Sequence, residues 1–290
     1  MLSFFQLAHN TFKECLRGSV YFLILATALV MIGIFPSLTM FVFQNPLKLV
    51  IDSCMATTML FGLFTAVLCA GHTINREMKN GTVLLLMSKP VTRIAYIAAK
   101  LVGITLALSV FVFICNAATF VSVIIAKDEF ILDYLAMSLF YLVLLAAVLY
   151  GAIRNFMAQK SFAAESVMAA VVLYPILAVV MNVIRWPEDM EHAAHFFMPN
   201  LLLPALLLLF PAVWLMGIIS ATLAIRLDFV SNLLICFAVF LLGLVAQYFT
   251  TMYLGNGLAA DFLSVIVPNW QYFWMADALN AEIAIPYTYV

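Results

Sequence analysis

Charge is scarce in this chain. Charged residues make up 9% of the 290 residues and hydrophobic residues make up 67%, well above the roughly 45–50% apolar content of soluble domains. The 13 basic and 14 acidic residues nearly cancel, so no concentrated basic face is available to bind nucleic acid. The composition therefore predicts an integral membrane protein and excludes nucleic acid as a partner.

Catalytic and metal-binding patterns are missing as well. No Gly-x-x-x-x-Gly-Lys-[Ser/Thr] motif occurs, so the chain has no P-loop with which to bind ATP. Glu191, His192 and His195 come nearest to a metal site, but two histidines three residues apart in a loop are a weak signal. The sequence predicts a chain that is not an enzyme and holds no metal or cofactor.

Seven segments are long and apolar enough to cross a bilayer, which requires about 20 apolar residues in a helix. They are residues 20–43, 53–74, 94–126, 134–153, 162–184, 199–225 and 229–250. The predicted fold class is all-α, a polytopic transmembrane helical bundle that forms a single membrane domain over residues 1–290. Within it, residues 20–126 hold the first three spans and residues 134–250 hold the others.

The positions of Lys and Arg orient the chain, because basic residues accumulate in cytoplasmic loops. If the amino terminus is inside, ten basic residues fall on the cytoplasmic side and three on the outer side. The inner set is Lys13, Arg17, Arg76, Lys79, Lys89, Arg93, Lys100, Arg154, Lys160 and Arg226, and the outer set is Lys48, Lys127 and Arg185. This asymmetry predicts a cytoplasmic amino terminus.

Ionisable side chains avoid the middle of the spans. Those nearest a span lie close to its ends, at Asp52, His72, Lys100 and Glu165, and the mid-span polar residues are the uncharged Asn116, Asn182 and Gln247. An ion-coupled carrier needs a group that can exchange charge deep in the bundle. The pattern argues against such a carrier. Uptake that is driven by an ion gradient without ATP would revive this alternative.

Residues 1–17 have an amphipathic pattern ahead of the first span. Phe5, Ala8, Phe12 and Leu16 recur at helical spacing, and polar residues occupy the other positions. The pattern predicts an interfacial elbow helix with its rings in the acyl boundary and its basic residues toward anionic lipid headgroups. A simple amino-terminal extension is the alternative.

The inner loop between the second and third spans, residues 75–93, is charged and carries an apolar ridge at residues 83–87. Arg76, Glu77, Lys79 and Arg93 can form charge-assisted hydrogen bonds with a partner. The ridge can either be covered by that partner or lie in lipid, and the residues alone leave both possibilities open.

The third span is longer than the bilayer requires. As a helix, residues 94–126 would measure about 50 Å, so its first two turns should project into the cytosol. Lys100 should then lie near the interface with its ammonium group in water. Ala95, Ala99 and Gly103 recur every four residues and form a seam that lets another helix approach closely.

Two further features complete the pattern. Pro36, Pro175, Pro204 and Pro211 fall inside spans, where each removes a backbone donor and can kink its helix. The outer segment, residues 251–290, is rich in Trp and Tyr, which gather at the headgroup level. Short outer surface helices are expected at residues 262–267 and 272–276.

The inner loop resembles the signature of type 2 ABC transporter permeases. The resemblance is carried by Ile74-Asn75-Arg76-Glu77-Met78-Lys79-Asn80-Gly81-Thr82, by Ser88-Lys89-Pro90-Val91-Thr92-Arg93, and by the basic Lys100. A second match, Asn10-Thr11-Phe12-Lys13-Glu14-Cys15-Leu16-Arg17, is similar to the elbow segment of the subgroup associated with multicopper enzyme maturation.

The resemblance implies a permease subunit of an ATP-driven transporter in the bacterial inner membrane, more consistent with export than with import. It implies a homodimer or a pseudo-symmetric permease dimer that binds a separate ABC ATPase, which holds the ATP and Mg²⁺. The contact with that ATPase would be made by Arg76, Glu77, Lys79, Gly81, Thr82, Ser88, Pro90 and Arg93, and the elbow would include Phe12, Glu14 and Arg17.

One departure from the family pattern and one alternative function remain open. Family members commonly have six spans and end inside, whereas this sequence offers seven and stops at Val290 on the outer side. Either a last span is missing from this sequence or one predicted span is wrong. The alternative function is a membrane scaffold or assembly protein that recruits a cytosolic partner without transporting anything.

Overall fold

The predicted spans are helical. The computed structural model describes residues 2–41, 46–75, 93–126, 133–185, 202–249 and 268–274, which contain no strand. Seven helical stretches in these residues are long and apolar enough to cross a membrane, as the sequence predicts. The longer helices are α1 (Leu2–Arg17), α2 (Ser19–Leu38), α3 (Pro46–Ala70), α6 (Arg93–Ile125), α7 (Tyr134–Ala158), α8 (Phe162–Arg185), α11 (Leu209–Ala224) and α12 (Phe229–Phe249). The short elements are η1 (Thr39–Phe41), the π-helical turn η2 (Gly71–Asn75), α10 (Leu202–Leu207) and η4 (Trp270–Phe273).

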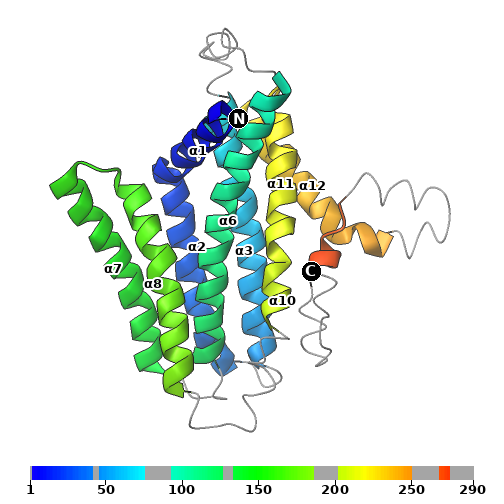
Figure 1. Ribbon diagram of the computed structural model, residues 1–290. Coiled ribbons are helices and arrows are strands. Elements are labelled where there is room, and N and C mark those ends of the chain that lie inside the picture. The colour runs from blue at the N-terminus through cyan, green and yellow to red at the C-terminus, as the bar shows by residue number, and fades with distance from the viewer. Residues whose placement is uncertain are drawn as a thin grey trace.

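The helices form a bundle with α3 and α6 at its centre (Figure 1). These two spans are 72% and 78% buried, whereas the spans of α7 and α12 are 22% and 28% buried. Helices α7 and α8 pack as a pair on one side, and α12 leans outward on the other (Figure 1). The outer helices expose leucine-rich faces, such as Leu142, Leu145 and Leu149 on α7. Such faces suit hydrocarbon, because their side chains are apolar and the backbone polar groups inside a helix are already paired.

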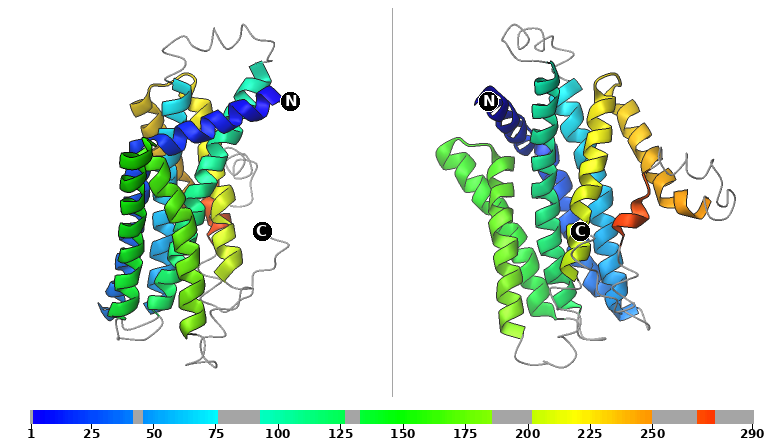
Figure 2. Two further views of the ribbon diagram at one scale, coloured as in Figure 1. Left: turned by 60° about the vertical axis from the view of Figure 1, so that its left-hand side comes forward. Right: turned by 45° about the vertical axis from the view of Figure 1, so that its right-hand side comes forward.

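Basic residues gather at one end of the bundle. The end that carries α1 also holds the start of α6, the α7–α8 turn and the α11–α12 turn (Figures 1 and 2). Of the basic residues in the described ranges, Lys13, Arg17, Arg93, Lys100, Arg154, Lys160 and Arg226 lie toward this end, and Lys48 and Arg185 lie toward the other. The charge asymmetry read from the sequence is thus an asymmetry between the two ends of one bundle.

Two buried hydroxyl groups join α2 to α6. The Tyr21 hydroxyl donates to the Ala107 carbonyl oxygen at 2.9 Å, and the Ser122 hydroxyl donates to the Ile32 carbonyl oxygen at 2.9 Å. Both donors can reach a carbonyl of the neighbouring helix because the helices pack closely. The first span is thereby fixed to the central helix near both of its ends.

A sharp turn connects α7 to α8. Gln159 follows α7 in the left-handed conformation, with φ of 52°, and the Asn155 side-chain amide donates to the Lys160 carbonyl oxygen at 2.6 Å. Arg154 and Lys160 each lie 3.4 Å from a different carboxylate oxygen of Glu165. One carboxylate thus pairs with two cationic side chains at the end of the bundle that carries α1.

The sixth span has a local irregularity at Leu208, and a polar residue of α6 lies next to it. Helix α10 ends at Leu207 and α11 begins at Leu209, where Pro211 has no N–H to donate to the Leu207 carbonyl. Leu208 nevertheless keeps helical backbone angles, and its N–H donates to the Pro204 carbonyl oxygen at 3.1 Å. The Asn116 side-chain amide donates to the Leu206 carbonyl oxygen at 2.9 Å. Helices α2 and α8, by contrast, continue through Pro36 and Pro175. Of the four prolines, only those of the sixth span accompany an interruption in the described helices.

Replacing Asn116 with Leu is expected to lower the free energy of unfolding by about 1 kcal/mol, a typical contribution for a hydrogen bond between membrane helices. The Leu206 carbonyl would lose its hydrogen bond to α6. Reversible unfolding in mixed micelles measures the change. The same substitution at Asn182, an exposed amide on α8, should leave stability unchanged or raise it, and an equal loss for both variants would contradict the role of Asn116.

The outer aromatic segment packs against α12. Trp270 is buried, and its indole N–H donates to the Phe240 carbonyl oxygen at 3.1 Å. A side chain at Gly243 would collide with this indole and with the Pro268 carbonyl. The helical turn η4 starts two residues before the surface helix predicted at 272–276, because the Asn269 side chain caps it by accepting from the Gln271 N–H. The helix predicted at 262–267 lies outside the described residues.

Candidate functional site

The inner loop joins η2 to α6. Of its predicted contact residues, Arg76, Glu77, Lys79, Gly81, Thr82, Ser88 and Pro90 lie outside the described residues, and Arg93 is the first residue of α6. The described structure therefore shows the two elements that flank the loop. The first is the π-helical turn η2, a type of distortion often found at functional sites. The second is α6, a single helix of 33 residues.

The elbow helix α1 lies across α6 at an oblique angle (Figure 2). The small-residue seam predicted on the third span provides the crossing point. A Cβ atom at Gly103 would lie 2.6 Å from the Thr11 Cβ and 2.7 Å from the Ala8 carbonyl oxygen. Ala99, one turn earlier on the same face, is fully buried. Only glycine at position 103 allows the backbone of α1 to come this close to α6.

Helix α1 buries a face against the bundle that the sequence did not predict, since the amphipathic pattern placed its rings in lipid. Ala8, Thr11, Cys15 and Leu16 form this buried face. Phe5 is 69% exposed, and Phe12 is half-buried. Small side chains face α6 because the close approach at Gly103 leaves no room for rings. The recurrence of small residues at 8, 11 and 15 is the signal in the sequence that could have revealed this face.

Lys100 is more deeply buried than the sequence predicts. Its expected position had the ammonium group in water, but the residue is only 3% exposed. Lys100 lies one turn before Gly103, in the part of α6 that α1 crosses. The sequence predicts that the first turns of α6 project into the cytosol, and it does not indicate that α1 packs against them.

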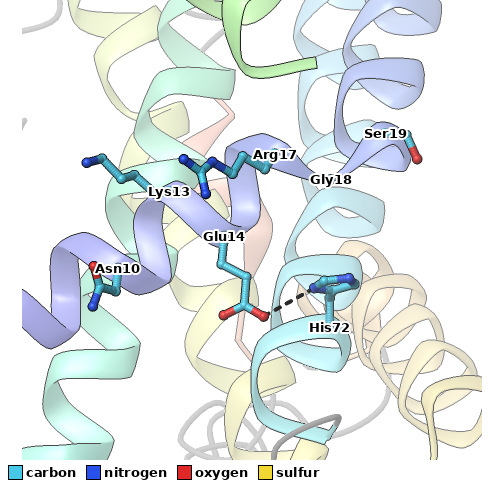
Figure 3. Close-up of a pocket in the computed structure, with 7 residues that line it drawn as sticks. All are labelled: Asn10, Lys13, Glu14, Arg17, Gly18, Ser19 and His72. Atoms are coloured by element: carbon cyan, nitrogen blue, oxygen red, sulfur yellow. Dashed lines mark ion pairs between the residues drawn. The ribbon is translucent and has the colours of Figure 1, made fainter. Parts of the chain in front are cut away.

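Polar residues at the elbow surround a cavity of about 460 Å³. The lining residues are Asn10, Lys13, Glu14, Arg17, Gly18, Ser19 and His72 (Figure 3). Glu14 of α1 places a carboxylate oxygen 3.6 Å from Nδ1 of His72 in η2. The two side chains are 34% and 49% exposed, so their pairing contributes at most about 1 kcal/mol and requires a protonated imidazole. Of the elbow residues predicted from the sequence, Glu14 and Arg17 line the cavity.

The described part of the chain offers no other chemical centre. No group of three or more His, Cys, Asp or Glu residues in these ranges could hold a metal ion, and residues 191–195 lie outside them. The five cysteines are free and buried. Cys15 of α1 and Cys69 of α3 are close enough for their thiols to form a hydrogen bond, which places the elbow against the second span as well as the third.

Comparison with known proteins assigns the chain to a family. Residues 20–254, from the first span to just beyond α12, match the family described as ABC-2 family transporter protein. The chain belongs to this family. The match includes the inner loop and all seven helical spans, whereas the whole of α1 precedes it. No curated protein and no solved structure matches the chain.

Membership of the ABC-2 family fits the sequence and the fold. The chain is an integral membrane protein and a membrane component of an ABC transporter, and such components function with an ABC ATPase in general. The predicted type 2 ABC permease family is therefore confirmed, while the match does not distinguish its subgroups.

Proposed function

We propose that this ABC-2 protein is the permease subunit of an exporter and that a separate ABC ATPase drives it by gripping the inner loop, residues 75–93. The proposal includes a dimer of permease subunits, a cytoplasmic amino terminus in a bacterial inner membrane, and ATP with Mg²⁺ on the partner. The elbow sequence at residues 10–17 supports placing the chain near the multicopper maturation subgroup.

The observation that carries the proposal is the continuity of α6. This helix begins at Arg93, where the inner loop ends, and crosses the whole bundle as one helix of 33 residues. Its span is 78% buried, the highest value among the seven. A displacement of the loop would thus reach the centre of the bundle without passing through a flexible joint. ATP binding could then favour one of two arrangements of the helices.

The orientation can be tested by labelling single introduced cysteines, because the native cysteines are buried. A cysteine at Lys79 should react with a membrane-impermeant maleimide in inverted vesicles and not in intact cells. A cysteine at Tyr134, which is 74% exposed at the opposite end of the bundle, should react only in intact cells. The reverse pattern would reject the proposed coupling.

The partner and the activity can be tested together by purification from native membranes. The chain is expected to copurify with an ABC ATPase that crosslinks to the Lys79 position, and the reconstituted complex should transport substrate when ATP is supplied. An ATPase that copurifies and hydrolyses ATP without any transport would favour the scaffold function instead. Crosslinks that never reach a nucleotide-hydrolysing partner would reject both ATP-driven transport and the assigned role of the loop.

A further inference from the structure

The elbow cavity lies where the interfacial helix α1 meets the first span. Its volume of about 460 Å³ falls within the range of about 300–1,000 Å³ that is usual for small-molecule sites. Its walls come from α1, from the Gly18–Ser19 connection and from η2. Six of its seven lining residues, all except Gly18, carry polar or ionisable side chains, which favours a ligand with a polar group.

The lining has an excess of positive charge. Asn10, Lys13, Glu14 and Arg17 are spaced as i, i+3, i+4 and i+7, which places them along one side of α1. Figure 3 shows Glu14 turned toward His72, and Lys13 and Arg17 extending away from this pair. Lys13 and Arg17 are exposed like charges four residues apart, an arrangement that is slightly unfavourable and that a bound anion would relieve. Arginine in particular binds phosphate through paired hydrogen bonds.

The start of α2 adds to this positive field. Gly18 precedes the helix and supplies no side-chain cap, and the first turn of α2 has no acidic residue. The first N–H groups of α2 thus receive no side-chain cap, and the positive end of the helix dipole lies at the elbow. A phosphate in the cavity would lie close to two cationic side chains and to the start of a membrane-spanning helix.

An apolar surface leads from the cavity into the membrane. Directly after Ser19, α2 exposes Val20 and Leu23, and the same helix exposes Val30, Met31, Ile34 and Leu38 farther along. Phe5 of α1 is also exposed. A soluble anion would make no use of this surface, whereas the acyl chains of a lipid would cover it.

We propose that the elbow cavity binds the phosphate headgroup of one anionic phospholipid, with Lys13 and Arg17 holding the phosphate and the acyl chains lying along α2. The lipid would fix the angle between α1 and α2. This inference does not depend on the proposed ATPase coupling, because it concerns only the elbow and the bilayer.

Native mass spectrometry of the purified chain, titrated with phosphatidylglycerol, tests the proposal. The double variant Lys13→Gln/Arg17→Gln should bind this lipid about 30-fold more weakly, since each basic residue near an anionic headgroup contributes a factor of roughly five. The matched control is Lys160→Gln/Arg226→Gln, which removes two positive charges from the same end of the bundle but outside the cavity. The control should retain the affinity of the unaltered chain.

Three results would overturn the proposal. The first is equal binding by the double variant and the unaltered chain. The second is an equal loss of affinity in the control, which would indicate general attraction to surface charge. The third is tight binding of glycerol 3-phosphate without retention of phosphatidylglycerol, which would assign the cavity to a soluble phosphate. Thermal unfolding of each variant, expected to match that of the unaltered chain, excludes misfolding as the cause of a loss.

Discussion

Replacing Glu77 with Lys is expected to abolish substrate-stimulated ATP hydrolysis while leaving membrane insertion intact. The proposed role of Glu77 is to accept a charge-assisted hydrogen bond from the ATPase. Reversing its charge would leave the partner's group unpaired and repelled. Losses of this kind cost about 2–5 kcal/mol in a protein interface, which corresponds to a fall in affinity of roughly 30-fold to several thousandfold. ATPase activity of the reconstituted complex, measured with and without substrate, provides the readout.

Two comparison variants make the Glu77 experiment specific. Glu77→Gln keeps the shape and one acceptor oxygen, so it should retain part of the stimulated activity. Asp228→Lys makes the same charge reversal at an exposed residue of the α11–α12 turn, at the same end of the bundle, and should leave stimulation close to normal. Full stimulation in Glu77→Lys would refute the coupling role of the loop, and its loss in Asp228→Lys would point to net charge instead.

Replacing Gly103 with Leu is expected to detach the elbow helix from the bundle. Even a Cβ atom at this position would lie 2.7 Å from a backbone oxygen of α1, and backbone cannot move aside as the end of a side chain can. Overpacking of this kind usually costs about 1–3 kcal/mol, and separation of the two helices relieves it. Cys15 is on the buried face of α1 and is only 3% exposed. It should then become reactive to maleimide in a variant whose other four cysteines are replaced by alanine.

The matched control for this experiment is Gly217→Leu on α11. A Cβ atom there would meet the Leu108 side-chain methyl at 2.5 Å, with no backbone atom among its nearest contacts. Leu108 can change rotamer, so Cys15 should stay protected in this variant. Protection of Cys15 in Gly103→Leu as well would show that α1 does not depend on the close approach to α6.

The sequence is sufficient to predict the spans because hydropathy and length decide which segments cross a membrane. It is also sufficient to predict the elbow helix and the seam at Ala99 and Gly103, since both appear as helical periodicity. The start of α3 was harder to place. The structure begins this helix at Pro46, seven residues before the predicted span, because a hydropathy criterion excludes the polar residues Lys48 and Asp52 although both are helical.

What the sequence could not give was the pairing of helices. The partner of the Gly103 seam, the burial of Lys100 and the turn of α1 toward Thr11 and Cys15 all depend on which helix crosses α6. The cavity at the elbow depends on the same crossing, because His72 is 58 residues away from Glu14 in sequence. The contact residues of the inner loop remain a prediction, since all except Arg93 lie outside the described residues.

The irregular turn at Leu208 separates two pieces of one span that make different contacts. Its outer piece, α10, is only six residues long, and Asn116 attaches that piece to α6 through the Leu206 carbonyl. Its inner piece, α11, packs broadly against α3 and α6. Both pieces are therefore attached to α6, α10 through a hydrogen bond and α11 through packing. A tilt of α6 would thus be felt along the whole length of the sixth span.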